Sequence, residues 1–287
     1  MNPTHEAPPL LEVRDLCKQF SHGAVTAADR ISFRVDRGGA LGIVGESGSG
    51  KTTISRIVAG LESADSGEIL IDGSPAETGR GFRQRMARAR VMQMVFQDPY
   101  QSLDPRQTPR DALAEIVTLH TSHRGASRAR RVDELLDQVG LDSAASRRMP
   151  RDLSGGQRQR VAIARALAAE PRLLILDEAV AALDVSIQAQ ILRLLDRIRR
   201  ELGVALLFVS HDLEVVRWVT DDVLVMFRGQ TAEQGPTQTV LEDPQHLYTR
   251  LLLESAPSID WDPEAVSRAR TAFFESVHAN GFAGLSA

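Results

Sequence analysis

The sequence is poor in cysteine, in lysine and in long apolar runs, and each shortage excludes a class of protein. Its single cysteine, Cys17, leaves no internal disulfide and no all-cysteine zinc or iron–sulfur site. No run approaches the roughly 18–20 apolar residues that a membrane-spanning helix needs. The first nine residues are polar and proline-rich, without the basic and apolar blocks of a signal peptide. We therefore expect a cytoplasmic protein that reaches a membrane only through a partner.

Net charge argues against nucleic acid as a ligand. The 287 residues carry a formal charge of −4, whereas nucleic-acid binders usually present a net basic face. One arginine-rich segment runs against this trend, with Arg80, Arg83, Arg85, Arg88 and Arg90. Only Phe82 is available there as a stacking platform for bases. We interpret the segment as a solvated face and predict no nucleic-acid partner.

Strands and helices alternate along most of the chain. Short strands are predicted over residues 10–13, 31–35, 41–44, 68–72, 173–176 and 204–209, and helices over residues 52–61 and 187–202. Turns at Asp72-Gly73 and at Arg228-Gly229 predict sharp reversals, the second within a hairpin over residues 223–233. Residues 98–150 are helical in pattern and resemble an insertion. The alternation predicts an α/β fold with a mostly parallel sheet.

A glycine-rich loop between a predicted strand and a predicted helix carries the strongest chemical signal. It reads Gly45-Glu46-Ser47-Gly48-Ser49-Gly50-Lys51-Thr52, a complete phosphate-binding loop. Glycines let backbone N–H groups converge on phosphate oxygens, and the helix N-terminus adds positive potential. Of 34 basic residues only Lys18 and Lys51 are lysine, and one of them falls in the slot that the motif requires. An accidental glycine-rich turn is therefore a poor explanation.

Two further motifs become informative because the phosphate loop is present in the same chain. The apolar run 173–176 ends in Asp177-Glu178, and carboxylates at a strand end can hold Mg²⁺ or polarise a water molecule. Leu153-Ser154-Gly155-Gly156-Gln157 precedes a helical segment, with Ser154 in the N-cap position. This second helix start can bind an anion but has no evident phosphate of its own. Taken alone, the first motif also fits an acidic turn after a buried strand, and the second a capped helix with a flexible entry.

Together these motifs resemble the ATPases of ABC transporters over about residues 10–255. The shared elements, in order, are the phosphate loop, Gln97 in a Phe-Gln-Asp-Pro segment, Leu153 to Gln157, Asp177-Glu178, Ala182-Leu183-Asp184 and Ser210-His211-Asp212. The segments 96–106 and 183–190 are similar to those of the subunits that power dipeptide, oligopeptide and nickel import. Pro244-Gln245-His246-Leu247-Tyr248-Thr249 resembles the C-terminal element of the same group.

The resemblance implies a fold and a set of site residues. The fold is a P-loop cassette with a mostly parallel core sheet, an antiparallel β subdomain and an inserted helical subdomain over about residues 98–150. The cassette would span residues 10–255, followed by a C-terminal extension over residues 256–287. The implied catalytic residues are Glu178 as general base, His211 at the γ-phosphate and Gln97. The implied magnesium ligands are Thr52, Gln97 and Asp177. The implied ATP-binding residues are Phe20, Gly45, Glu46, Ser47, Gly48, Ser49, Gly50, Lys51, Thr52, Thr53, Ser154, Gly155, Gly156, Gln157 and Asp184. For Phe20, which would stack on adenine, a place in the core is the alternative.

The resemblance also implies partners. Such cassettes work in pairs, so Ser154 to Gln157 of one subunit would close over ATP on a second subunit, which is a copy or a paralogue. Two transmembrane permease subunits and, indirectly, an extracytoplasmic substrate-binding protein would complete an importer at the cytoplasmic face of the membrane. A soluble ABC ATPase of translation or nucleic-acid repair is the alternative. The chain has neither the second cassette nor the long coiled coil of those proteins. A small-molecule kinase would leave Leu153 to Gln157 unexplained.

The sequence departs from the family pattern at four positions. Alanines stand at Ala179 and Ala181, where proline and serine are usual, Leu247 stands in place of proline, and Gly39 in place of an acidic residue. None of these changes removes a group that would touch phosphate, so we expect an active site. The two alanines are expected to bear on communication between paired sites.

Overall fold

The computed structural model describes residues 8–76, 81–98, 103–255, 271 and 273. The strands are β1 (Leu11–Phe20), β2 (Val25–Val35), β3 (Ala40–Val44), β4 (Ser66–Ile71), β5 (Ser74–Pro75), β6 (Met92–Val95), β7 (Leu173–Asp177), β8 (Ala205–Ser210), β9 (Asp222–Phe227) and β10 (Gln230–Pro236). The helices are α1 (Lys51–Val58), α2 (Phe82–Val91), α3 (Pro109–His120), α4 (Gly125–Gln138), α5 (Gly155–Leu167), α6 (Val185–Leu202), α7 (Leu213–Val219), α8 (Thr237–Glu242) and α9 (Leu247–Glu254). Among these helices none is both long and apolar enough to cross a membrane.

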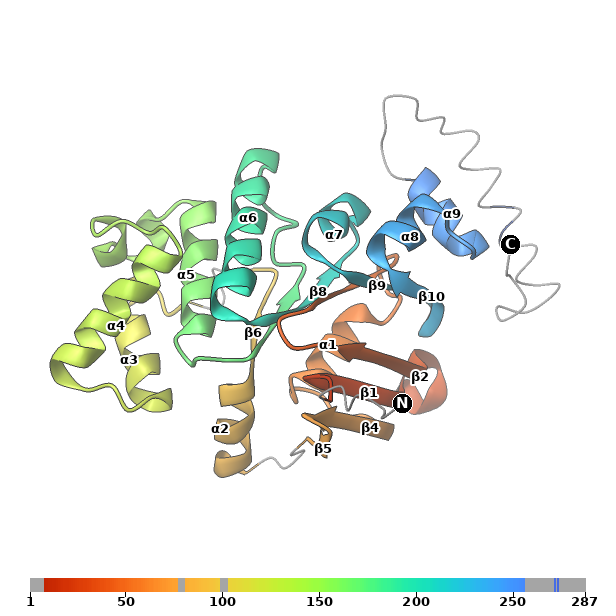
Figure 1. The fold of residues 1–287 in the computed structure, drawn as a ribbon, viewed down its shortest axis with the longest axis horizontal. Coiled ribbons are helices and arrows are strands. Elements are labelled where there is room, and N and C mark those ends of the chain that lie inside the picture. Colours follow the sequence, from red (N-terminus) through yellow and green to blue (C-terminus); the bar gives the residue numbers. More distant parts are fainter. Residues whose placement is uncertain (1–7, 77–80, 99–102, 256–270, 272, 274–287) are drawn as a thin grey trace, which may run out of the picture.

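A six-stranded sheet forms the centre of the molecule, in the order β10-β9-β3-β8-β7-β6 (Figure 1). Neighbouring strands are parallel from β9 to β6, and β10 closes the edge as an antiparallel hairpin with β9. Every residue of β3, β7 and β8 is buried, as strands covered on both faces require. The predicted α/β class and mostly parallel sheet are therefore confirmed.

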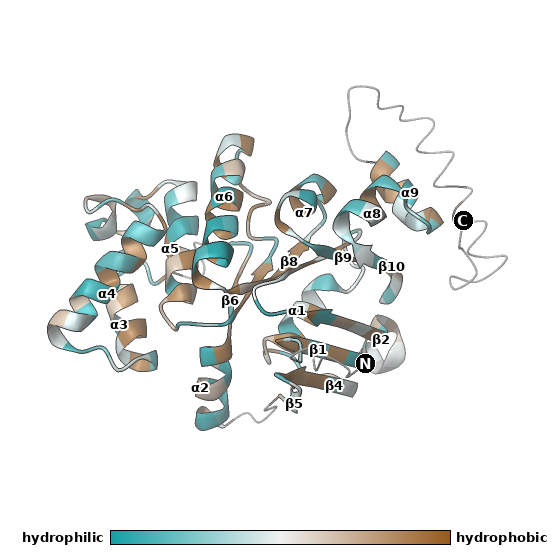
Figure 2. Cartoon of the chain, in the orientation of Figure 1, coloured by the Kyte–Doolittle hydropathy of each residue, from teal (hydrophilic) through white to brown (hydrophobic). Residues whose placement is uncertain are grey.

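The two faces of this sheet belong to two different cores. Leu174 and Leu176 of β7 pack with α5, α6 and α7, whereas Leu173 and Ile175 pack with α1 and the second sheet. That second sheet is antiparallel, in the order β2-β1-β4-β5. In Figure 2 strand β8 is hydrophobic and helix α2 is largely hydrophilic, which separates the buried centre from the periphery.

The helices predicted within residues 98–150 form a group on one side of the sheet (Figure 1, yellow-green). Thr108 caps α3, and Pro109 occupies its first turn, where the missing N–H costs no hydrogen bond. Leu113 and Val117 of α3 and Leu135 of α4 are fully buried and join the core that also contains α5. The helical interpretation of this region is confirmed for its described part. Residues 99–102 lie outside the described residues.

Local turn and end signals also agree with the structure. Asp72 and Gly73 have φ of 52° and 74°, and Arg228 and Gly229 have φ of 46° and 82°. Positive φ at both central residues matches the right-handed twist of the flanking strands. Gly203 ends α6 with φ of 66°, as predicted.

Strand β1 is longer than the predicted strand over residues 10–13. It continues to Phe20 through a region where its register to β2 shifts between Val13 and Lys18. Asp15 has φ of 47° in this region, so the chain bulges and the alternation of apolar and polar residues is interrupted. The bulge explains why the sequence pattern revealed only the beginning of the strand.

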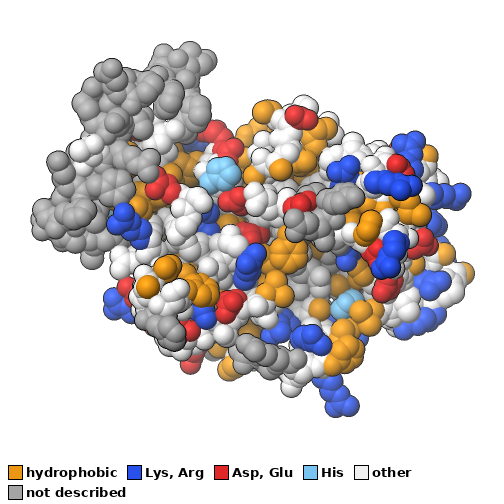
Figure 3. Space-filling model, turned by 180° about the vertical axis from the view of Figure 1, so that it is seen from behind, with side chains coloured by type: hydrophobic (Ala, Val, Ile, Leu, Met, Phe, Trp, Pro, Cys, Tyr) orange, Lys and Arg blue, Asp and Glu red, His pale blue; other side chains and the backbone are white. Residues whose placement is uncertain are grey.

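The arginine-rich segment forms helix α2, which buries none of its residues. Arg83, Arg85 and Arg90 are exposed, in agreement with a solvated face, while Arg80 lies outside the described residues. Seen from behind, the molecule carries positive and negative side chains interspersed over its surface (Figure 3).

Candidate functional site

The phosphate loop joins β3 to α1 in a conformation that requires glycine. Gly45, Gly48 and Gly50 have φ of 149°, 80° and 106°. A Cβ atom on Gly45 would collide with the carbonyl oxygen of Met226, and one on Gly50 with that of Ala27. Glu46 is half-buried, Ser47 and Gly48 are exposed, and Thr53 lies in the first turn of α1. The loop is thus fitted tightly to β2 and β9 at both ends and open at its tip.

Two polar groups of the loop are buried. Lys51 is 4% exposed, and its Nζ donates to the carbonyl oxygens of Gly45 and Glu46 at 2.8 Å each. Burial lowers the pKa of Lys51, against the carboxylates of Glu178, Asp177 and Glu46, which raise it. Ser49 Oγ is buried without a hydrogen-bond partner among the described residues. An ammonium group and a spare hydroxyl donor at a helix N-terminus fit a phosphate group.

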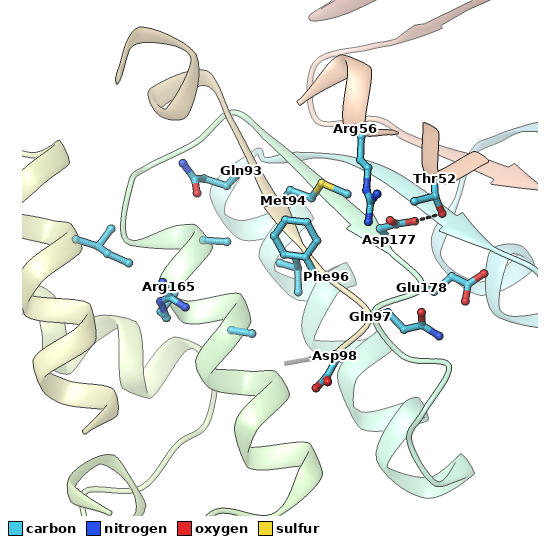
Figure 4. Close-up of a pocket in the computed structure, with 14 residues that line it drawn as sticks. Thr52, Arg56, Gln93, Met94, Phe96, Gln97, Asp98, Arg165, Asp177 and Glu178 are labelled. Carbon is cyan, nitrogen blue, oxygen red and sulfur yellow. Dashed lines mark hydrogen bonds between the residues drawn. The ribbon is translucent and has the colours of Figure 1, made fainter. Parts of the chain in front are cut away.

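Asp177 ends β7 next to the first turn of α1. Its Oδ1 accepts a hydrogen bond from Thr52 Oγ1 at 3.1 Å (Figure 4, dashed line). Burial raises the pKa of Asp177, while the Thr52 hydroxyl and Arg56 oppose this effect. A buried carboxylate that is disfavoured as an anion gains most when a cation binds beside it.

Glu178 and His211 follow neighbouring parallel strands, β7 and β8. His211 Nδ1 lies 3.4 Å from Glu178 Oε1, and the Glu178 N–H donates to the Val209 carbonyl at 3.0 Å. Glu178 has φ of 50°, an uncommon conformation that turns the chain sharply at the strand end. The carboxyl ends of parallel strands meet at one sheet edge, where open α/β sheets bind ligands.

Gln97 reaches the same edge from the segment after β6. It lines a cavity of about 630 Å³ together with Thr52, Asp177 and Glu178, and with Arg165 of α5. Figure 4 shows Gln97 and Glu178 projecting from adjacent segments beside the Thr52–Asp177 pair. The structure thus brings Gln97, Asp177 and Glu178 next to the first turn of α1, which carries Lys51 and Thr52.

The predicted magnesium ligands fit the ion's preferences. Thr52, Asp177 and Gln97 offer a hydroxyl, a carboxylate and an amide oxygen at one cavity, and Mg²⁺ prefers oxygen ligands and keeps several waters. Within the described residues, His, Cys, Asp and Glu form no cluster of three that could hold a metal ion.

Ser154 begins helix α5 with a reciprocal cap. Its Oγ accepts from the Gln157 N–H at 3.2 Å, and Gln157 Oε1 accepts from the Ser154 N–H at 2.9 Å. Gly156 is buried, and a Cβ there would lie 2.7 Å from Ile187 Cγ2 on α6. Ser154, Gly155 and Asp184, the last at the start of α6, are exposed. None of Ser154 to Gln157 lines the 630 Å³ cavity that contains Thr52, Asp177 and Glu178.

Phe20 lies at the end of β1, on the antiparallel sheet. It is 38% exposed and belongs to neither core cluster, so the alternative of a core phenylalanine is not supported. Lys18 Nζ lies 5.0 Å from the centre of its ring and forms ion pairs with Glu62 and Asp65. An exposed ring is available for stacking.

One contact of the phosphate loop comes from the C-terminal element. Tyr248 is 1% exposed, and its hydroxyl oxygen accepts a hydrogen bond from the Glu46 N–H at 3.0 Å. In the sequence, residues 244–249 are distinguished only by their resemblance to a family's C-terminal element, and no local pattern connects them to a loop 202 residues away.

Comparison with known proteins identifies two family regions. Residues 28–181 match the ABC transporter family, and residues 232–273 match the oligopeptide/dipeptide transporter C-terminal region.

Curated relatives are similar over most of the chain. The oligopeptide transport ATP-binding protein OppF of Bacillus subtilis (strain 168) is 42% identical over 94% of this chain and 89% of its own length. The di/tripeptide transport ATP-binding protein DppF of Pseudomonas aeruginosa (strain UCBPP-PA14) is 43% identical, over 88% and 81%. The glutathione import ATP-binding protein GsiA of Salmonella typhi is 44% identical, but the chain spans only 42% of its length.

Solved structures share the fold. CbiO1 from Clostridium perfringens, part of the ABC transporter complex cbiONQ, has a TM-score of 0.75 and 31% identity, covering 83% of this chain and 92% of its own. The dimeric post-hydrolysis state of the ATP-binding cassette MJ0796, bound to ADP and Pi, has a TM-score of 0.71 and 27% identity, covering 79% and 98%.

Proposed function

The chain belongs to the ABC transporter family of ATPases, and we propose that it is the subunit that powers the import of peptides or of related small solutes. The observation that carries the proposal is the match of residues 232–273 to the C-terminal region of oligopeptide/dipeptide transporters. A soluble ATPase of translation or repair would not be expected to carry this C-terminal region. Nickel chelates remain within the proposed solute class.

We propose that the cassette spans residues 10–255, with the helical subdomain at about residues 98–150, and that residues 256–287 form an extension. Support for the inserted subdomain comes from α3 and α4, which pack on α5 beside the central sheet. The match to the C-terminal region begins within β10 and so includes part of the cassette.

In the proposed site, the loop from Gly45 to Thr53 holds the phosphates of ATP. Lys51 contributes a positive charge, and the N–H groups of the first turn of α1 contribute hydrogen bonds. Phe20 stacks on the adenine. Thr52, Asp177 and Gln97 would hold Mg²⁺, and the ion would supply positive charge to neutralise the charge that develops on the phosphates.

Glu178 is the proposed general base. Its carboxylate lies at the sheet edge beside Gln97, where it can accept a proton from an attacking water molecule. His211, within 3.4 Å of that carboxylate, is placed to orient it and to contact the γ-phosphate. The exposed His211 imidazole leaves room for a nucleotide beside it.

The active unit is proposed to be a pair of cassettes. Ser154 to Gln157 and Asp184 would contact ATP held by a second subunit, either a copy of this chain or a paralogue. Support comes from the exposed, capped N-terminus of α5, which offers an anion site outside the chain's own cavity. The cassette MJ0796, which shares the fold, is dimeric in its solved structure.

The remaining partners follow from the importer proposal. Two transmembrane permease subunits would bind the helical subdomain on the cytoplasmic face of the membrane, and an extracytoplasmic binding protein would deliver the substrate. The test is the ATPase rate of the full chain, alone and reconstituted with its permease pair in vesicles. We expect a low rate alone and a rise when the binding protein and a peptide are added. An ATPase rate that does not change when the permeases, the binding protein or any peptide is added would refute the importer assignment.

Replacing Glu178 with Gln tests the catalytic and closing steps together. We expect hydrolysis to slow by about 10²-fold or more, because general-base catalysis is lost. ATP should still bind and trap a stable cassette dimer, detected by gel filtration with light scattering. Glu201→Gln is the matched control, since Glu201 is exposed on α6 away from the cavity. Failure of ATP to trap a dimer in Glu178→Gln would contradict the proposed pairing.

A further inference from the structure

The C-terminal element is anchored to the edge of the central sheet by one carboxylate. Glu233 of β10 accepts hydrogen bonds from the N–H groups of Gln245 and His246, at 2.8 and 3.2 Å. Two N–H donors on one carboxylate fix the turn between α8 and α9 relative to β10. The turn cannot move without breaking both bonds.

His246 sets the start of helix α9. Its Nδ1 accepts a hydrogen bond from the Tyr248 N–H at 3.1 Å, and the residue is buried. This cap satisfies one of the N–H groups that a helix start leaves without an intrahelical partner. The first turn of α9, and with it Tyr248, is therefore held in place.

The side chain of Tyr248 reaches the phosphate loop through an aromatic cluster. Its ring centre lies 4.6 Å from that of Phe227 and 5.6 Å from that of Phe273. The Met226 carbonyl of the same strand, β9, lies so close to Gly45 that a Cβ atom there would collide with it. With the ring confined, the hydroxyl oxygen has little freedom, and it accepts the Glu46 N–H at 3.0 Å.

The Glu46 N–H and the Gly45 carbonyl belong to the same peptide group. In a trans peptide these two groups point in opposite directions across one rigid plane. Tyr248 Oη binds the N–H edge, and Lys51 Nζ donates to the carbonyl edge at 2.8 Å. The plane that Tyr248 orients therefore carries one of the two carbonyl oxygens that hold the Lys51 ammonium, the other being that of Glu46.

We propose that Tyr248 is a positioning residue for Lys51, acting through the Gly45–Glu46 peptide, and that the C-terminal element contributes to the nucleotide site through this one side chain. The inference rests on the proposed role of Lys51 as a phosphate ligand. It gives the segment 244–249 a function inside the cassette, independent of the transported solute.

A double-mutant cycle tests this coupling. Tyr248→Phe removes the acceptor and keeps the ring, and Lys51→Ala removes the group that it is proposed to position. Affinity for ADP with Mg²⁺ is measured on the full chain by fluorescence titration extended to millimolar ADP. We expect Tyr248→Phe to weaken binding roughly three- to tenfold, the range for one lost hydrogen bond. In the Lys51→Ala background the same change should have little effect.

Thr249→Val is the matched control, because the buried Thr249 Oγ1 has no hydrogen-bond partner among the described residues. It removes a hydroxyl from the same helix and should leave ADP affinity unchanged. As a second measurement, amide hydrogen exchange of residues 41–51 should speed up in Tyr248→Phe and not in Thr249→Val.

Equal weakening in both backgrounds, or none, would overturn the positioning role while leaving the nucleotide site intact. If Lys51→Ala alone bound ADP as tightly as the unmodified chain, the proposed nucleotide site itself would fall.

Discussion

Substitutions of Ser154 can separate its local role in helix α5 from its proposed role at the partner's nucleotide. Locally, Ser154 Oγ caps the helix by accepting the Gln157 N–H. Ser154→Ala removes the cap and should cost about 1 kcal/mol of unfolding free energy. For a chain of this size that corresponds to a fall in Tm of roughly 2–4 °C. Ser154→Asp keeps an acceptor in the cap and adds a favourable charge at the helix start, so its Tm should equal or exceed that of the unmodified chain.

The order of activities should be the reverse for these two variants. Ser154→Ala loses one hydrogen bond to a charged phosphate, about 1.5–3 kcal/mol, and ATPase activity should fall roughly 10- to 150-fold. Ser154→Asp places a negative charge near the partner's γ-phosphate. Two like charges 4 Å apart at an effective dielectric constant of about 20 repel by about 4 kcal/mol, close to a thousandfold loss.

Two assays on the same preparations distinguish the helix-cap role of Ser154 from its contact with the partner's nucleotide. Thermal unfolding without nucleotide reports the cap, and steady-state ATPase with ATP-dependent dimerisation reports the trans contact. The expected order of stability is Asp, Ser, Ala, and the expected order of activity is Ser, Ala, Asp. An aspartate variant at least as active as the alanine variant would refute the trans contact and leave Ser154 as a helix cap only.

Three further substitutions test the energetics of the site and its surroundings. Asp177→Asn should raise Tm at pH 7, because burial raises the pKa of Asp177 and the folded state therefore disfavours the charged carboxylate. The gain in Tm should vanish at pH values below the ordinary aspartate pKa, where the aspartic acid is as neutral as the asparagine. The same variant should lose the effect of Mg²⁺ on ATP affinity, and an unchanged Mg²⁺ response would remove Asp177 from the metal site. Gly156→Ala should cost about 1–3 kcal/mol, since its Cβ would lie 2.7 Å from Ile187 Cγ2 and push α5 from α6. Gly203→Ala meets no atom within 4 Å but has φ of 66°, so it should cost only about 1–2 kcal/mol and leave ATPase activity unchanged, as urea unfolding and a rate assay would show.

Where local chemistry determines structure, the sequence was sufficient. The phosphate loop was predictable because glycines at fixed positions and a lysine at a helix start together form a phosphate-binding turn through interactions within a few residues. The cap at Ser154, the stop at Gly203 and the buried strand β7 were predictable for the same reason, since each depends on residues within a few positions. The interrupted pattern of β1 was not, because its bulge at Asp15 depends on pairing with β2.

The assembly of the site was decided by tertiary structure. Thr52 contacts Asp177, 125 residues away in the sequence, because the strand order of the central sheet brings β3, β8 and β7 side by side. Glu46 contacts Tyr248, 202 residues away, because the β9–β10 hairpin leads the chain to α9 next to the phosphate loop. Family resemblance could name Asp177 and Thr52 as partners in advance. Nothing in the residues around Tyr248 specifies a peptide group on another element, since that contact exists only when strand register and aromatic packing fix both sides within hydrogen-bonding distance.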